Sequence, residues 1–217
     1  MAHNNIYEKF MIEYDKANVT SSYPALTKYE VATLLDRAYL TLIARKLTGN
    51  NTRRTPFEYD TKAVEDLRPL VVTNEFGSPT HIADSNEYRF NLPKNLMYYL
   101  EGMISYYTGE QEIVIPTNHQ IARKFKQTSS NLPWIKQPVS YIEGDVIYVL
   151  IDPYKYKSSR PRTLDGTYIK EPKKFVKDDV FDEEKDTAVF ELSDTMAEEL
   201  ISLAVAMALE NVESPRL

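Results

Sequence analysis

The chain has no cysteine among its 217 residues, which excludes a disulfide framework, a thiolate metal site and a cysteine nucleophile. It has only six glycines and contains neither the GxxxxGK[ST] nor the GxGxxG phosphate-binding pattern. Its three histidines, His3, His81 and His119, are far apart in the sequence, and none has HExxH spacing. We therefore predict no nucleotide-binding loop and no metal site.

Long apolar runs and an excess of positive charge are also missing. The longest nearly apolar segment, residues 200–209, has ten residues, whereas a membrane span needs about 20. The start of the chain, MAHNNIYEKF, has no basic stretch followed by an apolar run, so we expect no signal peptide. The net charge is −6 and the pI is about 5.2, so we expect no general electrostatic attraction to nucleic acid or to anionic membranes.

Carboxylates are plentiful, but no catalytic arrangement of them is visible. The acidic run within residues 178–184 lacks the glycine turn and ligand spacing of a calcium loop, and it is typical of a solvated surface. Glu143, Asp145 and Asp152 flank predicted strands, where two carboxylates can act as acid and base. Nothing beyond turn chemistry distinguishes these three residues. We therefore predict a protein that is not an enzyme and that carries no cofactor.

What the sequence does contain is one long helix with both ends marked, over residues 26–49. Thr27 and Glu30 have the spacing of a capping box, in which each side chain satisfies the free backbone N–H of the other residue. Arg45 and Lys46 lie in the last turn, where cations suit the helix dipole, and Gly49 follows as a stop. The apolar stripe of this helix consists of Val31, Leu34, Leu35, Ala38 and Leu42.

A second strongly apolar helix is predicted over residues 194–211, with Ser193 or Thr195 as its cap. Its apolar positions form two adjoining stripes, one with Met196, Leu200, Leu203, Ala204 and Met207 and the other with Ile201, Val205, Ala208 and Leu209. A helix that is apolar on most sides is buried on several sides. It is therefore either a central core helix or one whose second stripe is covered by another chain.

Between these helices the pattern is mostly that of strands. Two-residue alternation or short apolar runs predict strands at residues 70–73, 87–92, 100–108, 112–115, 139–142, 145–151 and 164–170, with a last strand or extended segment at 187–192. Further helices are predicted at 5–18, at 57–68 with Ala63, Val64 and Leu67 inward, and at 118–127 with Asn118 as its cap and Ile121 and Phe125 on one face. One or two helical turns are predicted at 94–99. The strand at 100–108 has Leu100, Gly102, Ile104 and Tyr106 on one side, Glu143 and Gly144 form the turn of a hairpin, and Trp134 is expected to fill the core. The fold class that follows is α+β, with long terminal helices packed together and a mostly antiparallel β region inserted between them. We expect one domain over residues 1–217, with its helical part at 1–68 and 193–217 and its β-rich insertion at about 70–192.

One basic segment stands out against the acidic background. Lys155, Lys157, Arg160 and Arg162 fall within eight residues, interleaved with tyrosines and serines. Such a segment can contact phosphates without recognising bases. The alternatives are a solvated hairpin loop, docking onto an acidic patch of a partner, or the lining of a passage used by DNA.

Four stretches carry a resemblance to a known class of proteins. They are LTKYEVATLLDRAYL at residues 26–40, LPWIKQPVSYIEGDVIYVLIDP at 132–153, TYIKEPKKF at 167–175, and ELSDTMAEELISLAVAMALENVESPRL at 191–217. In these stretches the chain resembles the ring or adaptor proteins of the head-to-tail connector, or neck, of tailed bacteriophages, most of all those of crAss-like podoviruses.

The resemblance implies a non-enzymatic structural protein of the virion. Such subunits form a homo-oligomeric ring of about twelve copies beneath the portal protein. They contact other neck and tail proteins, and they seal and extend the channel for the phage DNA, with which they make only transient, non-specific contact. The implied location is the virion neck or tail region, after assembly in the host cytoplasm and without a membrane. Docking would fall to residues 74–86 and 154–162. The competing hypotheses are an acidic accessory protein that contacts nucleic acid or another virion component through residues 154–162, and an enzyme with an unseen site.

Overall fold

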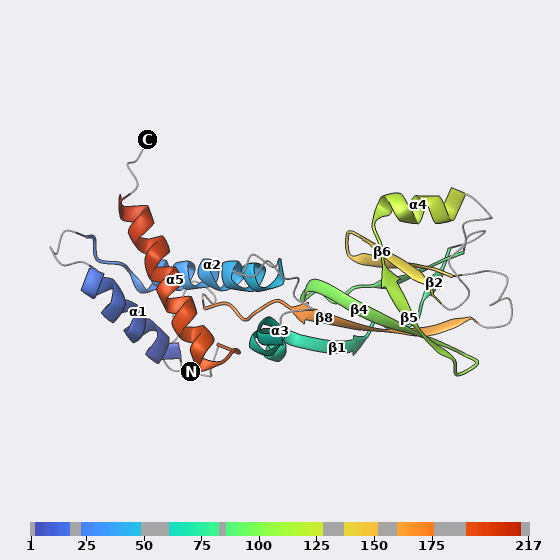
Figure 1. Cartoon of the computed structure of the whole chain (residues 1–217), viewed down its shortest axis with the longest axis horizontal. Coiled ribbons are helices and arrows are strands. Elements are labelled where there is room, and N and C mark those ends of the chain that lie inside the picture. Colours follow the sequence, from blue (N-terminus) through green and yellow to red (C-terminus); the bar gives the residue numbers. More distant parts are fainter. Residues whose placement is uncertain are drawn as a thin grey trace. The chain divides into compact units, whose positions relative to one another are not determined.

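A computed structural model describes residues 3–17, 23–48, 61–82, 86–127, 137–151, 160–175 and 190–213. The chain divides into two compact units, one made of Met1–Leu70 with Pro172–Leu217 and the other of Val71–Glu171. Helices make up the first unit and a large sheet the second (Figure 1). The predicted α+β class, with a sheet region inserted between terminal helices, is confirmed.

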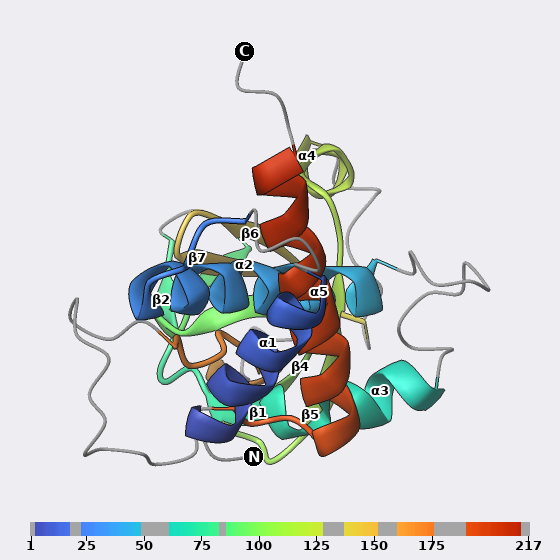
Figure 2. The same ribbon diagram turned by 90° about the vertical axis from the view of Figure 1, so that its left-hand side faces the viewer.

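The helical unit contains α1 (His3–Ala17), α2 (Lys28–Leu47), α3 (Thr61–Leu67), the 3-10 turn η2 (Arg68–Leu70) and α5 (Asp194–Glu213). Helix α5 packs against both α1 and α2 (Figure 2). Its apolar positions Met196, Leu200, Ile201 and Ala204 are almost fully buried. The predicted packing of the terminal helices is therefore confirmed, with α1 as an additional partner of α5.

Local signals account for the helix boundaries. The Thr27 N–H donates to Glu30 Oε2 at 2.8 Å, and the Glu30 N–H donates to Thr27 Oγ1 at 3.3 Å, so the predicted capping box is present. These bonds, first of all the one from the Thr27 backbone, lower the pKa of Glu30. At the start of α5 the Met196 N–H donates to Ser193 Oγ at 3.4 Å, so Ser193 is the cap.

The segment after the sheet is anchored on α2. The Phe175 N–H donates to Asp36 Oδ1 at 2.7 Å, and the Phe175 ring lies 6.2 Å from that of Tyr39, centroid to centroid. Phe190, just before α5, contacts the same tyrosine at 5.2 Å. One buried tyrosine of α2 therefore holds two separate returning segments of the chain.

The second unit is one eight-stranded sheet in the order β1-β8-β4-β5-β6-β7-β3-β2. Its strands are β1 (Val71–Glu75), β2 (Thr80–His81), β3 (Glu87–Asn91), β4 (Leu96–Tyr106), β5 (Gln111–Pro116), β6 (Val139–Glu143), β7 (Val146–Leu150) and β8 (Pro161–Lys170). All neighbouring pairs are antiparallel except β5 and β6, which are parallel. The predicted hairpin at Glu143 and Gly144 joins β6 to β7, with Gly144 at φ +58°.

The sheet encloses the core of this unit. Buried side chains from β8, β4 and β5 join those from β7 and β3 in one cluster, which includes Ile104, Val114, Leu164, Val149 and Phe90. The outer side of β6 and β7 is covered by α4 (His119–Gln127), whose Ala122 packs against Val139, Tyr141 and Leu150 (Figure 1). Asn118 caps α4 as predicted, because its Oδ1 accepts the Ile121 N–H at 2.9 Å.

Some local predictions are wrong. Residues 96–99, predicted as helical turns, belong to β4, which pairs with β8. The register shifts near Tyr98 and Leu100, and such bulges break the two-residue alternation that identifies a strand. Val64, predicted to face inward, is 37% exposed, because the two-turn helix α3 buries only Ala63 and Leu67. The described part of the predicted segment 187–192 is residues 190–192, which are neither helix nor strand.

Candidate functional site: the tip of the β4–β5 hairpin

The predicted basic segment is described only at its end. Lys155 and Lys157 lie outside the described residues. Trp134, which was predicted to fill the core, lies outside them as well. Arg160 and Arg162 are described, and both are exposed at the start of β8. The Arg160 carbonyl accepts the Tyr107 N–H at 3.2 Å, which fixes the end of the basic segment to the tip of the β4–β5 hairpin.

The shape of that tip follows from Gly109. This glycine has φ +86°, a left-handed conformation that other residues adopt only with strain. The Gly109 N–H donates to the Tyr106 carbonyl at 3.0 Å, and the Tyr106 N–H donates to the Glu110 carbonyl at 2.9 Å. The turn presents Tyr107 at its apex, where the side chain is 72% exposed.

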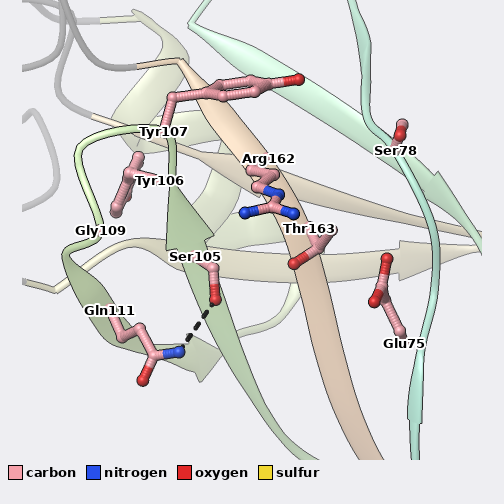
Figure 3. A pocket seen from close by; sticks show the side chains of 9 residues that line it. All are labelled: Glu75, Ser78, Ser105, Tyr106, Tyr107, Gly109, Gln111, Arg162 and Thr163. Atoms are coloured by element: carbon pink, nitrogen blue, oxygen red, sulfur yellow. Dashed lines mark hydrogen bonds between the residues drawn. The ribbon is translucent and has the colours of Figure 1, made fainter.

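A cavity of about 410 Å³ lies next to this tip. Its lining is mostly polar and comes from β1, β4, β5, β8 and the turns beside them: Glu75, Ser78, Ser105, Tyr106, Tyr107, Gly109, Gln111, Arg162 and Thr163. Figure 3 shows the Arg162 guanidinium among these groups, with Thr163 between it and the Glu75 carboxylate in this view. Gln111 Nε2 donates to Ser105 Oγ at 3.3 Å (Figure 3), which leaves the Ser105 hydroxyl proton available to a ligand.

The cavity offers polar and charged groups that can bind a ligand. Its lining has one guanidinium, one carboxylate, several hydroxyls and one amide. No histidine or lysine lines it within the described part of the chain. Neither Arg162 nor Glu75 has an ion-pair partner among the described residues. Both charges therefore remain open to a partner with complementary groups.

The charge of Arg160 acts on Tyr88 of β3. Burial raises the pKa of Tyr88 on β3, and the nearby charge of Arg160 partly opposes this rise. The strands β3 and β8 are far apart in the sheet order, so this interaction agrees with a sheet that curves round its core.

Sequence reasoning missed an apolar surface beside the cavity. Met103 on β4 and Ile113 on β5 lie directly opposite each other in the ladder, and they are 37% and 66% exposed. Ile115, two residues further on, is 41% exposed. The inward set of β4, including Gly102, Ile104 and Tyr106, was predicted correctly, and it leaves Met103 on the outer face.

A smaller polar cluster lies under α4. Tyr141 donates its hydroxyl proton to Glu87 Oε1 at 2.9 Å. The Tyr141 ring stacks on Tyr148 at 4.9 Å and meets the edge of His119 at 5.2 Å. These contacts fix the start of α4 on β6.

Within the ranges that the structure describes, no group of three or more His, Asp or Glu residues is arranged to hold a metal ion. No described helix is both long and apolar enough to cross a bilayer. Comparison with models of known protein families gave no match, and comparison with curated protein sequences gave none either.

Proposed function

We propose that this protein is a structural subunit of the head-to-tail connector of a tailed phage, forming a ring between the portal and the tail that seals and extends the DNA channel. The observation that supports the proposal most is the exposed apolar surface of Met103, Ile113 and Ile115. It lies beside a polar cavity whose charges have no partner among the described residues. Such a surface is typical of a subunit that is covered on assembly.

The segments that carry the sequence resemblance are packing elements in this fold. Residues 197–211 belong to α5, on which Leu200, Ile201 and Ala204 are buried in the helical unit. Residues 167–175 comprise the end of β8 and the segment whose Phe175 docks on α2. The resemblance therefore rests on how the chain folds, as expected for a protein whose role is to assemble rather than to catalyse.

The basic segment has a defined part in this proposal. Arg160 and Arg162, with Lys155 and Lys157 upstream in the sequence, contact either the phosphates of passing DNA or an acidic surface of a neighbouring virion protein. Contacts to phosphate carry no sequence information, which suits a channel through which every part of a genome passes.

Native mass spectrometry of the purified protein, alone and with the portal protein of the same genome, tests the proposal. We expect a closed multimer or a stoichiometric complex with the portal. A protein that stays monomeric and ignores the portal contradicts the proposal.

A charge-reversal pair tests the site. The double substitution Arg160→Glu with Arg162→Glu should leave the far-ultraviolet circular dichroism unchanged, because both side chains are exposed, and should weaken the partner or DNA contact. The matched control is Arg123→Glu with Lys124→Glu, two exposed cations on α4. Equal contact in both double variants removes Arg160 and Arg162 from the site.

The competing accessory-protein hypothesis is favoured by the exposure of both arginines. It predicts that the monomer alone binds DNA at low salt. Each phosphate contact then contributes a slope of about −0.9 to the dependence of log K on log salt. The connector proposal does not require DNA binding by the monomer before it assembles, so titration of the monomer with duplex DNA tests the accessory-protein hypothesis directly.

A further inference from the structure

The four strands β1, β8, β4 and β5 form a half-sheet with an open edge on each side. Strand β1 is the last strand of the sheet and pairs only with β8. Strand β5 pairs with β4 along Gln111–Val114, but with β6 only at Ile115 and Pro116. Residues 111–114 of β5 therefore form a second edge, because β6 pairs with β5 only beyond them.

The hydrogen-bond phase of β1 identifies the backbone groups at its open edge. The Phe76 N–H donates to the Leu164 carbonyl at 2.8 Å. Because hydrogen-bonded and non-bonded pairs alternate in an antiparallel ladder, Val72 and Asn74 also face β8. Thr73 and Glu75 therefore direct their N–H and C=O groups away from the sheet.

The same reasoning applies to β5. The Tyr106 N–H donates to the Glu110 carbonyl at 2.9 Å, so Glu112 and Val114 face β4, while Gln111 and Ile113 face outward. The Ile115 N–H, on that outward side, donates to the Pro138 carbonyl at 2.8 Å. Over the part of the chain that is described, the outward backbone groups of Thr73, Glu75, Gln111 and Ile113 have no partner.

Neither edge carries lysine or proline, two common blockers of strand addition. Residues 71–75 and 111–114 contain neither of them, and each segment has one charged residue, Glu75 and Glu112. Instead, Ile113 presents a side chain that is 66% exposed, directly opposite Met103. An open edge flanked by apolar side chains favours pairing with another strand.

The strand directions at the two edges allow them to pair with each other. Every neighbouring pair in β1-β8-β4-β5 is antiparallel, so β5 runs opposite to β1. If the sheet is continued past β5 by β1 of a second copy in the same orientation, the new pair is antiparallel and the outer faces stay on the same side. No inversion of the second copy is needed.

We propose that copies of this chain join edge to edge, with β5 of one copy paired to β1 of the next. The interface uses two different surfaces of one subunit, so it is head-to-tail. An open row of subunits then has a free β1 edge at one end and a free β5 edge at the other. The row closes into a ring when the rotation between neighbouring subunits permits. This inference rests on the proposed connector function, for which it names the interface between subunits.

Proline substitutions at the outward positions test the interface. Ile113→Pro removes an N–H that faces away from β4, and Thr73→Pro removes one that faces away from β8, so the ladders inside the subunit stay intact. Each variant should be monomeric by native mass spectrometry under conditions, with or without portal, in which the wild type assembles. The control Ile113→Val keeps the N–H and should assemble.

Mixing the two proline variants gives the sharpest result. Each variant retains the edge that the other has lost, so an equimolar mixture should form a one-to-one dimer and no larger species. A mixture that remains monomeric, or proline variants that still assemble, overturns the interface. If a proline variant does not fold, Ile113→Lys blocks the edge without changing the backbone and should give the same loss of assembly.

The outcomes also separate the two proposals. If the wild type and both proline variants form rings on the portal, the connector function is supported and this interface is refuted. A wild type that associates neither with itself nor with the portal refutes both.

Discussion

Replacing Gly166 on β8 by alanine should destabilise the sheet unit strongly, although alanine suits a strand better than glycine. The backbone of Gly166 is not left-handed, so alanine meets no conformational strain there. A methyl group would, however, overlap three atoms of the Phe76 ring. That ring is only 8% exposed and lies 6.0 Å from the Tyr168 ring and 6.4 Å from the Tyr99 ring, centroid to centroid. Phe76 cannot move aside without repacking both tyrosines.

The size of the effect follows from two contributions. Inserting a methyl group into a packed core costs about 1–3 kcal/mol, and expelling a buried phenylalanine side chain costs about 1.5–3 kcal/mol. Because the structure will relax along the cheaper of these two routes, we expect a loss of about 1–3 kcal/mol in the free energy of unfolding. Urea denaturation followed by circular dichroism measures it, and Tm should fall by about 2–4 °C for each kcal/mol.

A double-mutant cycle identifies the cause. Phe76→Ala alone should cost about 3–5 kcal/mol. In that background Gly166→Ala meets no ring, and it should be neutral or stabilise by about 0.5–1 kcal/mol, because glycine is unfavourable inside a strand. If Gly166→Ala costs the same in both backgrounds, the Phe76 ring is not what requires glycine at this position.

Three further predictions concern the helical unit and alkaline pH. Thr27→Ala should lower the free energy of unfolding by about 1 kcal/mol, and Thr27→Ser should restore most of it. Lys46→Met should cost about 1–3 kcal/mol by thermal unfolding, because Lys46 Nζ lies 2.8 Å from Asp66 and 3.3 Å from Glu199 and both carboxylates would lose it. The exposed neighbour Arg45→Met should cost little. Burial raises the pKa of Tyr99 above its usual 10.0, so unfolding ionises this tyrosine at high pH and stability falls as the pH rises past 10.0. Tyr99→Phe should flatten the alkaline decline of Tm, and an unchanged decline contradicts this reasoning.

The helices could be predicted because their signals are local. Ile6, Phe10 and Tyr14 recur every four residues, and all three are buried on α1. The Thr27 and Glu30 side chains meet across a single turn, so their spacing alone predicts the cap. Short helices were harder. On α4 the spacing of Ile121 and Phe125 indicated one apolar face, yet Ile121 is 42% exposed and Ala122 is the buried residue.

The candidate site could be predicted only in part, because it is built by strand pairing between distant segments. Arg162 was identified from its basic neighbours, but Glu75 reaches the same cavity only because β8 pairs with β1. Gln111 reaches it through the β4–β5 ladder. No local pattern encodes this strand order. Nor does the run Ile113, Val114, Ile115 reveal that only its middle residue faces the core, since all three are aliphatic and β-branched.

The open edge of β1 is a consequence of how the sheet unit is inserted into the chain. The unit begins with β1 and ends with β8, and these strands pair from Val71 opposite Ile169 onward. Entry and exit therefore lie side by side, as insertion into another unit requires. Since β8 has β4 on its other side, β1 has one neighbour among the described strands. Such edges are often shielded by lysine or by proline. Strand β1 has neither within residues 71–75, and β5 has neither within residues 111–114, which agrees with the proposed pairing of these two edges between copies of the chain.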